Sequence, residues 1–454
     1  MRRRSLAGPV LLILVGGVFL LYNLRPQIPV FELFSVYWPF LLIAWGLLRL
    51  AEVLVSAARS EPQRAGLSGG EVALVVILCL VGSGMFAAHR HGFRFNVRSL
   101  EVFGEQYEYP ISDQKALGTA KRIVFENARG NLRITGGDAP DIKVTGRKSI
   151  RAFSKGDADR ASQNTPLEFI DQGDQLLVRT NQDRVASNQR ISEDLEVVVP
   201  RGVGITANAS SGDFDVSDLD QGVEISADRA DVRLNRIGGA VRVELRHSDI
   251  IRVMDVKGSV DVQGRGTDVD LENIAGQVTL NGSYGGSLEF KNLAKPLHFE
   301  SQNTDLRVEK LPGEISMDLG EFTARNLVGP VRFVTKSRDV KIEDFTESLE
   351  LETERGDIDL VPNHLPLPRI TARSRAGRID LVLPDKAAFQ LEATAERGDA
   401  MNDFGPVLVK ETDGRSASLR GKVGQGPSIL LVTERGSVSV RKAGASGGTS
   451  EAKL

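Results

Sequence analysis

The chain has 454 residues, with 46 glycines, 6% aromatic residues and a formal net charge of −3. This length exceeds one ordinary domain of about 150 residues, and the many glycines with few aromatics suit turns between short β-strands. The nearly neutral charge gives no general attraction to nucleic acid, so no nucleic-acid partner is expected. Because Cys79 is the single cysteine, a disulfide framework and a multi-cysteine metal site are excluded.

Three apolar runs precede residue 90, at about residues 6–22, 36–57 and 72–88. Each approaches the roughly 20 residues that a helix needs to cross a bilayer. Residues 1–90 are therefore predicted to form an α-helical transmembrane region of three spans. A cleaved signal peptide is the alternative for the first run, but the following Tyr22-Asn23-Leu24-Arg25 lacks the small residues of a cleavage site.

Basic residues around these runs indicate their orientation, because arginine and lysine are enriched on the cytoplasmic side. Five arginines fall on the side of the N-terminus and four on the other side. The first group is Arg2, Arg3, Arg4, Arg59 and Arg64, and the second is Arg25, Arg90, Arg94 and Arg98. This small excess predicts a cytoplasmic N-terminus, and three spans then place the rest of the chain outside the cytoplasm.

The beginning of the chain resembles the LiaF-type transmembrane region of bacterial membrane proteins, some of which take part in cell-envelope stress signalling. The resemblance covers about residues 6–55 and rests on Gly8-Pro9, on Leu21-Tyr22-Asn23-Leu24 and on Tyr37-Trp38-Pro39-Phe40. That family unit has two spans, so the third span is an addition. The resemblance implies a multi-pass protein of the bacterial inner membrane.

After a predicted linker at 91–120, the sequence becomes repetitive. From Gly202 to Gly405 it divides into eleven units of 16 to 20 residues. Within a unit the apolar positions alternate in two short bursts, followed by one further apolar residue. In the unit from Ser259 these positions are Val260, Val262, Val269, Leu271 and Ile274.

Alternation with a period of two predicts strands with one buried face. Strands this short cannot bury a face alone, so neighbouring units are expected to stack around a shared core. The predicted fold class is an all-β parallel β-solenoid over residues 121–442, with coils of about 18 residues and two short strands each. An antiparallel sandwich is the structural alternative. At about 4.8 Å per coil, eleven units would extend for roughly 50 Å.

A small or flexible residue and then usually an acid precede the second strand of each unit. Asp is favoured here because its side chain can bond neighbouring backbone amides in a turn. Stacking would align these acids in a column, the acidic turn ladder: Asp213, Asp231, Asp249, Asp268, Asp305, Asp339 and Asp357. The prediction is turn capping with solvated charges. A cation-binding edge is the alternative, since Ca²⁺ takes several oxygen ligands.

The flanks of the repeats extend and close the stack. Residues 121–147 are predicted to form an opening coil, and 154–166 a short helix or a loop. LRGKVGQGPSILLVTERGSVSVRK supplies closing strands, and residues 443–454 form a polar tail that is expected to be disordered.

This region resembles the bacterial putative-adhesin family that is built of β-strand repeats. The similarity covers about residues 120–442 and rests on ENARGNLRI, LEVVVPRGVGITANASSGDFDV and GQGPSILLVTERGSVSV, which occur in the family's order. The resemblance implies the strand-repeat fold and supplies no catalytic residues.

Nothing in the sequence indicates catalysis or a bound cofactor. His247, His298 and His364 fall at different positions of their units, and no phosphate loop, nucleophile elbow or zinc motif is present. We therefore expect a non-catalytic structural or interaction module of the bacterial cell envelope, with a protein or an envelope polymer as partner. The alternatives are an envelope-stress sensor or regulator that signals through a membrane partner, a glycan-processing β-helix enzyme, and a cytoplasmic polymer-forming solenoid.

Overall fold

The structure is a computed structural model that describes residues 104–185 and 190–444, together with a few isolated helical residues between 39 and 83. Apart from those residues, the predicted spans at 6–22, 36–57 and 72–88 lie outside the described part of the chain. The LiaF-like region and the tail from residue 445 lie outside it as well. Among the described residues, no helix is long and apolar enough to cross a membrane.

The chain divides into two compact units, Met1–Tyr107 with Ile150–Ala161 and Glu108–Ser149 with Ser162–Leu454. Most of helix α4 (Lys155–Asn164) belongs to the first unit. The helix begins after Ser154, whose Oγ accepts a hydrogen bond from the Asp157 amide at 3.2 Å. A serine at this position satisfies an amide that has no partner inside the helix. Of the two alternatives predicted for 154–166, a short helix or a loop, the structure has the helix.

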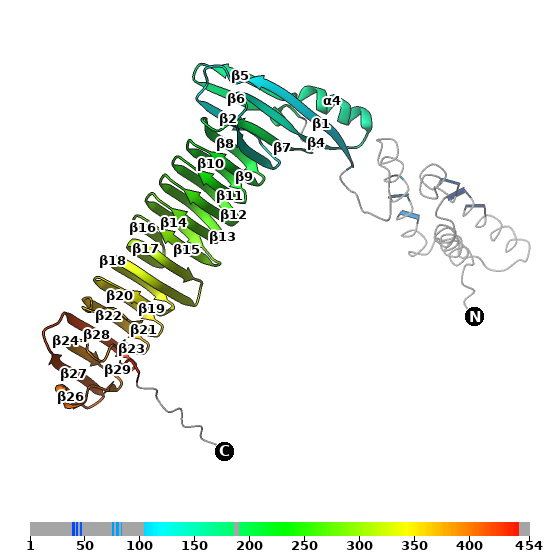
Figure 1. The fold of residues 1–454 in the computed structure, drawn as a ribbon. Helices are drawn as coiled ribbons and strands as arrows, with labels where there is room; N and C mark the ends of the chain where they lie inside the picture. Colours follow the sequence, from blue (N-terminus) through cyan, green and yellow to red (C-terminus); the bar gives the residue numbers. More distant parts are fainter. Residues whose placement is uncertain are drawn as a thin grey trace, which may run out of the picture. The chain divides into compact units, whose positions relative to one another are not determined.

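The second unit consists mainly of β-strands, as predicted (Figure 1). One strand, β1, lies within the segment for which the sequence predicts a linker. The strands are β1 (Glu105–Ala116), β2 (Arg122–Glu126), β3 (Leu132–Gly137), β4 (Asp141–Ala152), β5 (Glu168–Gln172), β6 (Gln175–Arg179), β7 (Arg190–Pro200), β8 (Gly204–Ser211), β9 (Phe214–Leu219), β10 (Val223–Arg229), β11 (Val232–Ile237), β12 (Val241–Val256), β13 (Val260–Ile274), β14 (Val278–Tyr284), β15 (Leu288–Leu293), β16 (Leu297–Ser301), β17 (Thr304–Met317), β18 (Glu321–Ser337), β19 (Asp339–Phe345), β20 (Leu349–Arg355), β21 (Ile358–Val361), β22 (Ile370–Ala376), β23 (Ile379–Leu383), β24 (Phe389–Ala395), β25 (Ala400–Asn402), β26 (Leu408–Asp413), β27 (Ser416–Val423), β28 (Ser428–Arg435) and β29 (Val438–Lys442), with 3₁₀ turns η1 (Gln182–Arg184) and η2 (Gly405–Val407).

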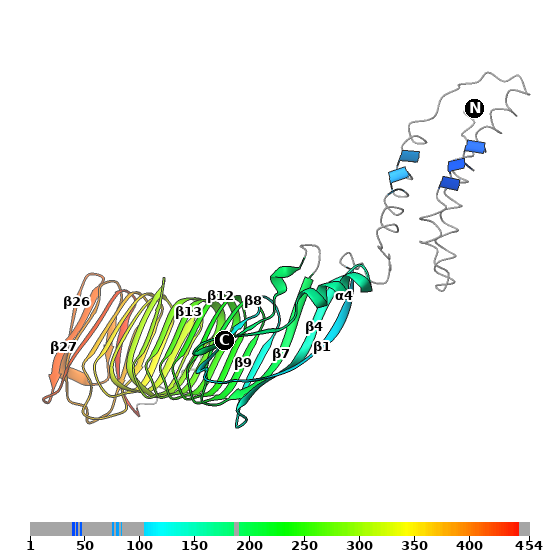
Figure 2. The same cartoon turned by 90° about the horizontal axis from the view of Figure 1, so that it is seen from above.

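The strands form two rows in which neighbours are hydrogen-bonded (Figures 1 and 2). The first row runs β5–β6–β2–β8–β10–β12–β13–β14–β16. The second row runs β4–β7–β3–β9–β11–β12–β13–β15. The long strands β12 and β13 contribute one half to each row. Partners lie one repeat apart in the sequence, as in Val260 with Val278, so the repeat period sets the register.

The core lies between the two rows and forms one hydrophobic cluster. Val260, Val262, Val269, Leu271 and Ile274 are all buried, which confirms the inward positions predicted for that unit. Their equivalents in neighbouring units stack on them in register. Each buried valine or leucine side chain contributes about 1.5–3 kcal/mol relative to exposure.

The stack reverses direction at β17, and the prediction of parallel coils throughout is wrong at this point. β17 pairs antiparallel with β16 and β15 on one side and with β18 on the other. A tight turn joins β17 to β18, where Asp318 Oδ1 accepts hydrogen bonds from the Gly320 and Glu321 amides at 2.7 Å each. Alternation of apolar residues encodes which face is buried and not which way a strand runs, so this reversal leaves no mark on the pattern.

Parallel pairing resumes at β18 and continues through β19, β20, β21, β22, β23, β28 and β29. The last predicted unit also differs from a parallel coil. β28 lies between β22 and β24, and β24 pairs antiparallel with β27, which pairs antiparallel with β26. The first row thus continues beyond β16 through β17, β18, β20, β22, β28 and β24. The antiparallel strands β24, β27 and β26 close it.

A second column of turn residues lies near the end of the second strand of most units, and the repeat pattern does not predict it. Its members all have positive φ angles between 50° and 62° and are Asp218, Arg236, Asp255, Asn273, Asn292, Asn326 and Asp344. Asn and Asp tolerate this left-handed conformation better than other residues with side chains. Asn292 Nδ2 donates to Asn273 Oδ1 at 2.8 Å, and Asn273 Nδ2 donates to Asp255 Oδ1 at 3.0 Å.

Candidate functional site

The acidic turn ladder caps backbone amides of the following coil. Asp231 Oδ1 accepts hydrogen bonds from the Asp249 and Ile250 amides at 3.0 Å each. Asp268 Oδ1 accepts from the Ser287 amide at 2.9 Å, and Asp339 Oδ1 from the Asp357 amide at 2.8 Å. Within the described part of the chain, no three His, Cys, Asp or Glu side chains are grouped to hold a metal ion. The contacts therefore support the turn-capping interpretation.

Three predicted members of this ladder behave differently. Asp249 Oδ1 lies 3.7 Å from His247 Nε2 and accepts from no backbone amide in the described residues. Asp305 lies on the antiparallel strand β17, where it faces Arg307 at 3.1 Å and His298 at 3.6 Å. It does not belong to the column, because β17 reverses the stack. At Asp213 the amide donates to Asn131 Oδ1 at 3.0 Å, so an asparagine performs the capping one coil earlier.

A groove of about 530 Å³ lies at the start of the second row, across β4, β7, β3, β9 and β11. Its volume is within the range of small-ligand sites. The backbone register aligns Glu196, Arg133 and Asp215 with Arg233 in a line across the strands. Its lining residues are Asn131, Leu132, Arg133, Thr145, Gly146, Arg147, Asp194, Leu195, Glu196, Asp213, Asp215 and Arg233.

The charges of the groove alternate along this line. Arg133 Nε lies 3.3 Å from Asp215 Oδ2, and its Nη1 lies 3.7 Å from Glu196 Oε1. Both pairs are well exposed, so each contributes at most about 1 kcal/mol to stability. A binding partner's charged groups can therefore replace either member of a pair at little cost in free energy. Arg233 registers with Arg252 on the next strand, which places two like charges side by side at the end of the groove. The surface therefore suits a polar, charged contact.

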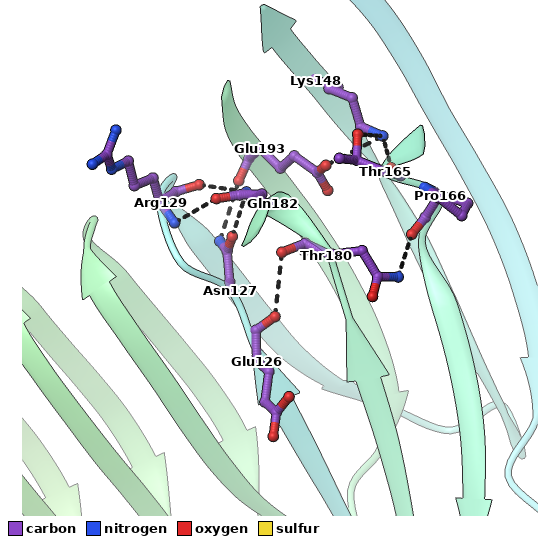
Figure 3. Close-up of polar contacts among 10 residues, drawn as sticks. Glu126, Asn127, Arg129, Lys148, Thr165, Pro166, Thr180, Gln182 and Glu193 are labelled. Atoms are coloured by element: carbon purple, nitrogen blue, oxygen red, sulfur yellow. Dashed lines mark hydrogen bonds and ion pairs between the residues drawn. The ribbon is translucent and has the colours of Figure 1, made fainter. Parts of the chain in front are cut away.

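A buried ion pair joins β4 and β7, two of the five strands that form the groove (Figure 3). Lys148 is 4% exposed and Glu193 is fully buried, and Lys148 Nζ lies 3.3 Å from Glu193 Oε1. The ammonium also donates to the Thr165 carbonyl and, at 3.2 Å, to Thr165 Oγ1. Apart from this close contact with Lys148, neither Glu193 carboxylate oxygen has a hydrogen-bond partner.

A polar network holds the backbone of Glu193 (Figure 3). The Glu193 amide donates to the Arg129 carbonyl at 3.0 Å, and its carbonyl accepts from Asn127 Nδ2 at 3.3 Å. Gln182 Nε2 donates to Asn127 Oδ1 and to the Arg129 carbonyl, at 2.9 Å each. Gly130 lies against this strand so closely that a Cβ atom there would lie 2.0 Å from the Glu193 carbonyl oxygen. The turn between β2 and β3 is therefore fastened to β7.

Burial raises the pKa of Glu193 from 4.5 to about 7, and the nearby Lys148 opposes the shift only in part. The cause is the low polarity around the side chain, which penalises the charged carboxylate. A carboxyl with such a pKa changes its protonation state near neutral pH.

The sequence contains a signal for this pair, although no motif marks it. β7 alternates as Ile191, Glu193, Leu195 and Val197, and all four side chains are buried. A charged residue thus occupies the inward phase of the alternation, and Lys148 does the same between Val144 and Ile150 on β4. The pairing itself could not be predicted, because these strands lie outside the regular repeats.

Comparison with known proteins gives the family of this fold. The Toastrack DUF4097 family model matches residues 120–441. The chain belongs to the Toastrack DUF4097 family. This agrees with the resemblance to adhesin-like strand-repeat proteins over residues 120–442. No curated protein matches the sequence.

Two solved structures are similar to the Toastrack chain at low identity. One is a putative cell adhesion protein from Clostridium sporogenes, with 9% identity, a TM-score of 0.19 and coverage of 74% of this chain and 100% of the other. The second is a putative adhesin from Parabacteroides distasonis, with 8% identity, a TM-score of 0.19 and coverage of 75% of this chain and 98% of the other.

Proposed function

We propose that this protein is a membrane-anchored β-solenoid that acts as an interaction module outside the cytoplasm of a bacterium, by binding and not by catalysis. One observation carries the proposal: parallel strands pair in register over many repeats, from β8 to β16 and again from β18 to β23. Such a stack presents long outward lines of side chains whose spacing the backbone fixes. This is a rigid surface for a macromolecular partner.

The anchor is the part of the proposal that the N-terminal sequence supports. The apolar runs before residue 90 and the LiaF-like elements at 6–55 favour a multi-pass region of the inner membrane. The excess of arginine on the N-terminal side favours an extracytoplasmic position for residues 121–442. A partner would then be a protein or a polymer of the cell envelope.

Reporter fusions after Gly444 test the location. Alkaline phosphatase is active outside the cytoplasm and β-galactosidase inside it, so we expect activity from the first fusion alone. Active β-galactosidase with inactive phosphatase would refute both the extracytoplasmic module and an envelope sensor.

The groove at the start of the second row is the region in which we expect partner contact. A photo-crosslinking amino acid in place of Arg233 should yield a discrete adduct in intact cells. The matched control replaces Thr371, an outward position of β22 in the first row. Equal adducts at both positions would show that the groove has no special role.

A further inference from the structure

The Lys148–Glu193 pair is unusual because it is costly. Removing two charges from water costs several kcal/mol per ion unless excellent geometry and further hydrogen bonds compensate. Here the Lys148 ammonium has Thr165 as an additional partner, whereas the Glu193 carboxylate has no further hydrogen-bond donor. Each unsatisfied buried group in a native protein calls for a physical explanation.

We infer that Glu193 and Lys148 form a proton-controlled latch that holds β4, β7 and the segment at Thr165 together. When Glu193 carries a proton, the buried carboxyl is neutral, so the cost of burying a carboxylate no longer opposes the closed arrangement, and the Lys148 ammonium keeps its hydrogen bonds to Thr165. When Glu193 loses the proton, a buried carboxylate whose one close partner is the Lys148 ammonium must be kept. The single ion pair offsets the desolvation cost only in part, so the closed arrangement is weakened.

Few other groups can control this proton. β4 contributes the Lys148 ammonium at 3.3 Å. The turn between β2 and β3 meets Glu193 through the backbone of Arg129, and η1 contributes the uncharged Gln182 to the network. Thr165 supplies a hydroxyl and a carbonyl to the lysine. Within the described residues, the charge that acts on the carboxylate is therefore that of Lys148.

The direction of the effect follows from the pKa of Glu193, which is about 7 in the folded protein against an ordinary value of 4.5. Because the folded state holds the proton more tightly, the latch contributes its full stability below about pH 4.5. That contribution is lost as the pH rises to about 7. Acidification of the surroundings therefore stabilises the closed arrangement of β4, β7 and the segment at Thr165.

The latch bears on the groove because both use the same strands. Arg147 and Asp194 line the groove, and each is the neighbour in sequence of one latch residue. Opening of the latch would separate β4 from β7 and disrupt the groove wall. This inference concerns the fold alone and does not depend on where the protein is located.

Hydrogen–deuterium exchange of the full-length chain in detergent tests the latch. Peptides from β4 and β7 are followed at about pH 5 and about pH 8, with intrinsic exchange rates corrected and peptides from β20 and β22 as internal reference. We expect the opening equilibrium of β4 and β7 to increase on the order of 50-fold over this range. The reference peptides should show no such increase.

Two variants separate the latch from other titrations. Glu193→Gln resembles the protonated carboxyl, so its β4 and β7 peptides should stay protected at both pH values. Glu196→Gln, which changes an exposed carboxylate on the same strand, should behave as the wild type does. If Glu193→Gln fails to fold, the wild-type comparison still decides the matter: pH-independent protection of β4 and β7 relative to the reference peptides would overturn the latch. A cytoplasmic reporter result would refute the proposed location and leave this measurement unchanged.

Discussion

Val262 shows how one inward position of a repeated strand is constrained. Its side chain is fully buried between the two rows and registers with Val243 and Leu280 on the neighbouring strands. Val262→Asp would bury a carboxylate without a partner, which costs about 3–5 kcal/mol. We expect loss of the cooperative unfolding transition for this segment, measured by urea denaturation and limited proteolysis.

Ser283→Asp is the matched control for that change. Ser283 is exposed at the end of β14 and registers with Arg265, so a carboxylate there remains solvated beside a positive charge. We expect its unfolding midpoint to stay close to that of the wild type. Unchanged protease resistance in Val262→Asp would contradict the inward assignment.

Arg338 stabilises a different residue-scale feature, a buried column of hydroxyl groups. The column runs in register through Thr304, Thr335, Thr353, Ser374 and Thr433. The last three hydroxyls donate to backbone carbonyls of the corner. At the other end of the column, Arg338 Nη1 donates to Thr304 Oγ1 at 2.6 Å and to Thr335 Oγ1 at 3.0 Å.

Arg338→Met should therefore destabilise the stack at the reversal. It removes three hydrogen bonds from a charged donor, two to these hydroxyls and one from Nε to the Asp318 carbonyl at 2.5 Å. We expect a loss of about 2 kcal/mol or more in the free energy of unfolding. Arg325→Met is the control, because Arg325 pairs with the partly exposed Glu343, and loss of such a pair should cost less than about 1 kcal/mol. If Arg338→Met and Arg325→Met lowered the free energy of unfolding equally in urea denaturation, the contacts of Arg338 with the hydroxyl column would contribute no specific stability.

At the scale of the element, the left-handed corner after the second strand is specified by a single residue per coil. Asn273 has φ +57° and joins Asp255 and Asn292 through its side-chain amide. Alanine in place of Asn273 would still have a Cβ atom that disfavours positive φ, and it would lack the side-chain amide that bonds Asp255 and Asn292. We expect a loss of about 1–2 kcal/mol in the free energy of unfolding, measured by denaturant titration.

Asn273→Gly divides that loss between its two causes. Glycine adopts positive φ without steric cost, so the glycine variant loses the hydrogen bonds and keeps the backbone conformation. It should be more stable than the alanine variant. The opposite order would mean that the backbone conformation is not what selects asparagine at this corner.

The same elements show what could be predicted from the sequence. The inward residues of the unit from Ser259 were predictable, because burial follows directly from alternation. The reversal at β17 was not, because a strand and its reverse bury the same alternate residues. The capping role of Asp231 followed from turn chemistry, whereas Asp305 was misassigned because its position in the repeat assumed a parallel strand.

The site is less predictable than the fold for a physical reason. Lys148 and Glu193 come from two strands outside the regular repeats, so no period relates them. Their inward phase could be recognised from alternation, but their mutual distance depends on how β4 pairs with β7. The groove likewise arises from five strands whose order along the second row differs from their order in the sequence.

At the scale of the whole molecule, in-register pairing means that one repeat can replace another. Val241 pairs with Val260, which pairs with Val278, and Ile251 pairs with Val269, which pairs with Leu288. Removal of the complete unit 259–276 would bring the outer members of both series together with their apolar faces still inward. The corner column would also close, since Asp255 and Asn292 are the outer partners of Asn273.

Deletion of 259–276 should therefore leave a folded, shorter stack, because each repeat contacts mainly its neighbours. Deletion of 259–267 removes only the first half of β13, which lies in the first row. The second half of β13 stays in the second row, so the two rows then differ by one strand and their coils no longer match. We expect cooperative thermal unfolding and wild-type protease resistance for the first deletion and neither for the second. If both deletions unfold alike, the strands are not interchangeable between coils, and stability must depend on contacts particular to each one. If both remain folded, register is not set by the repeat period.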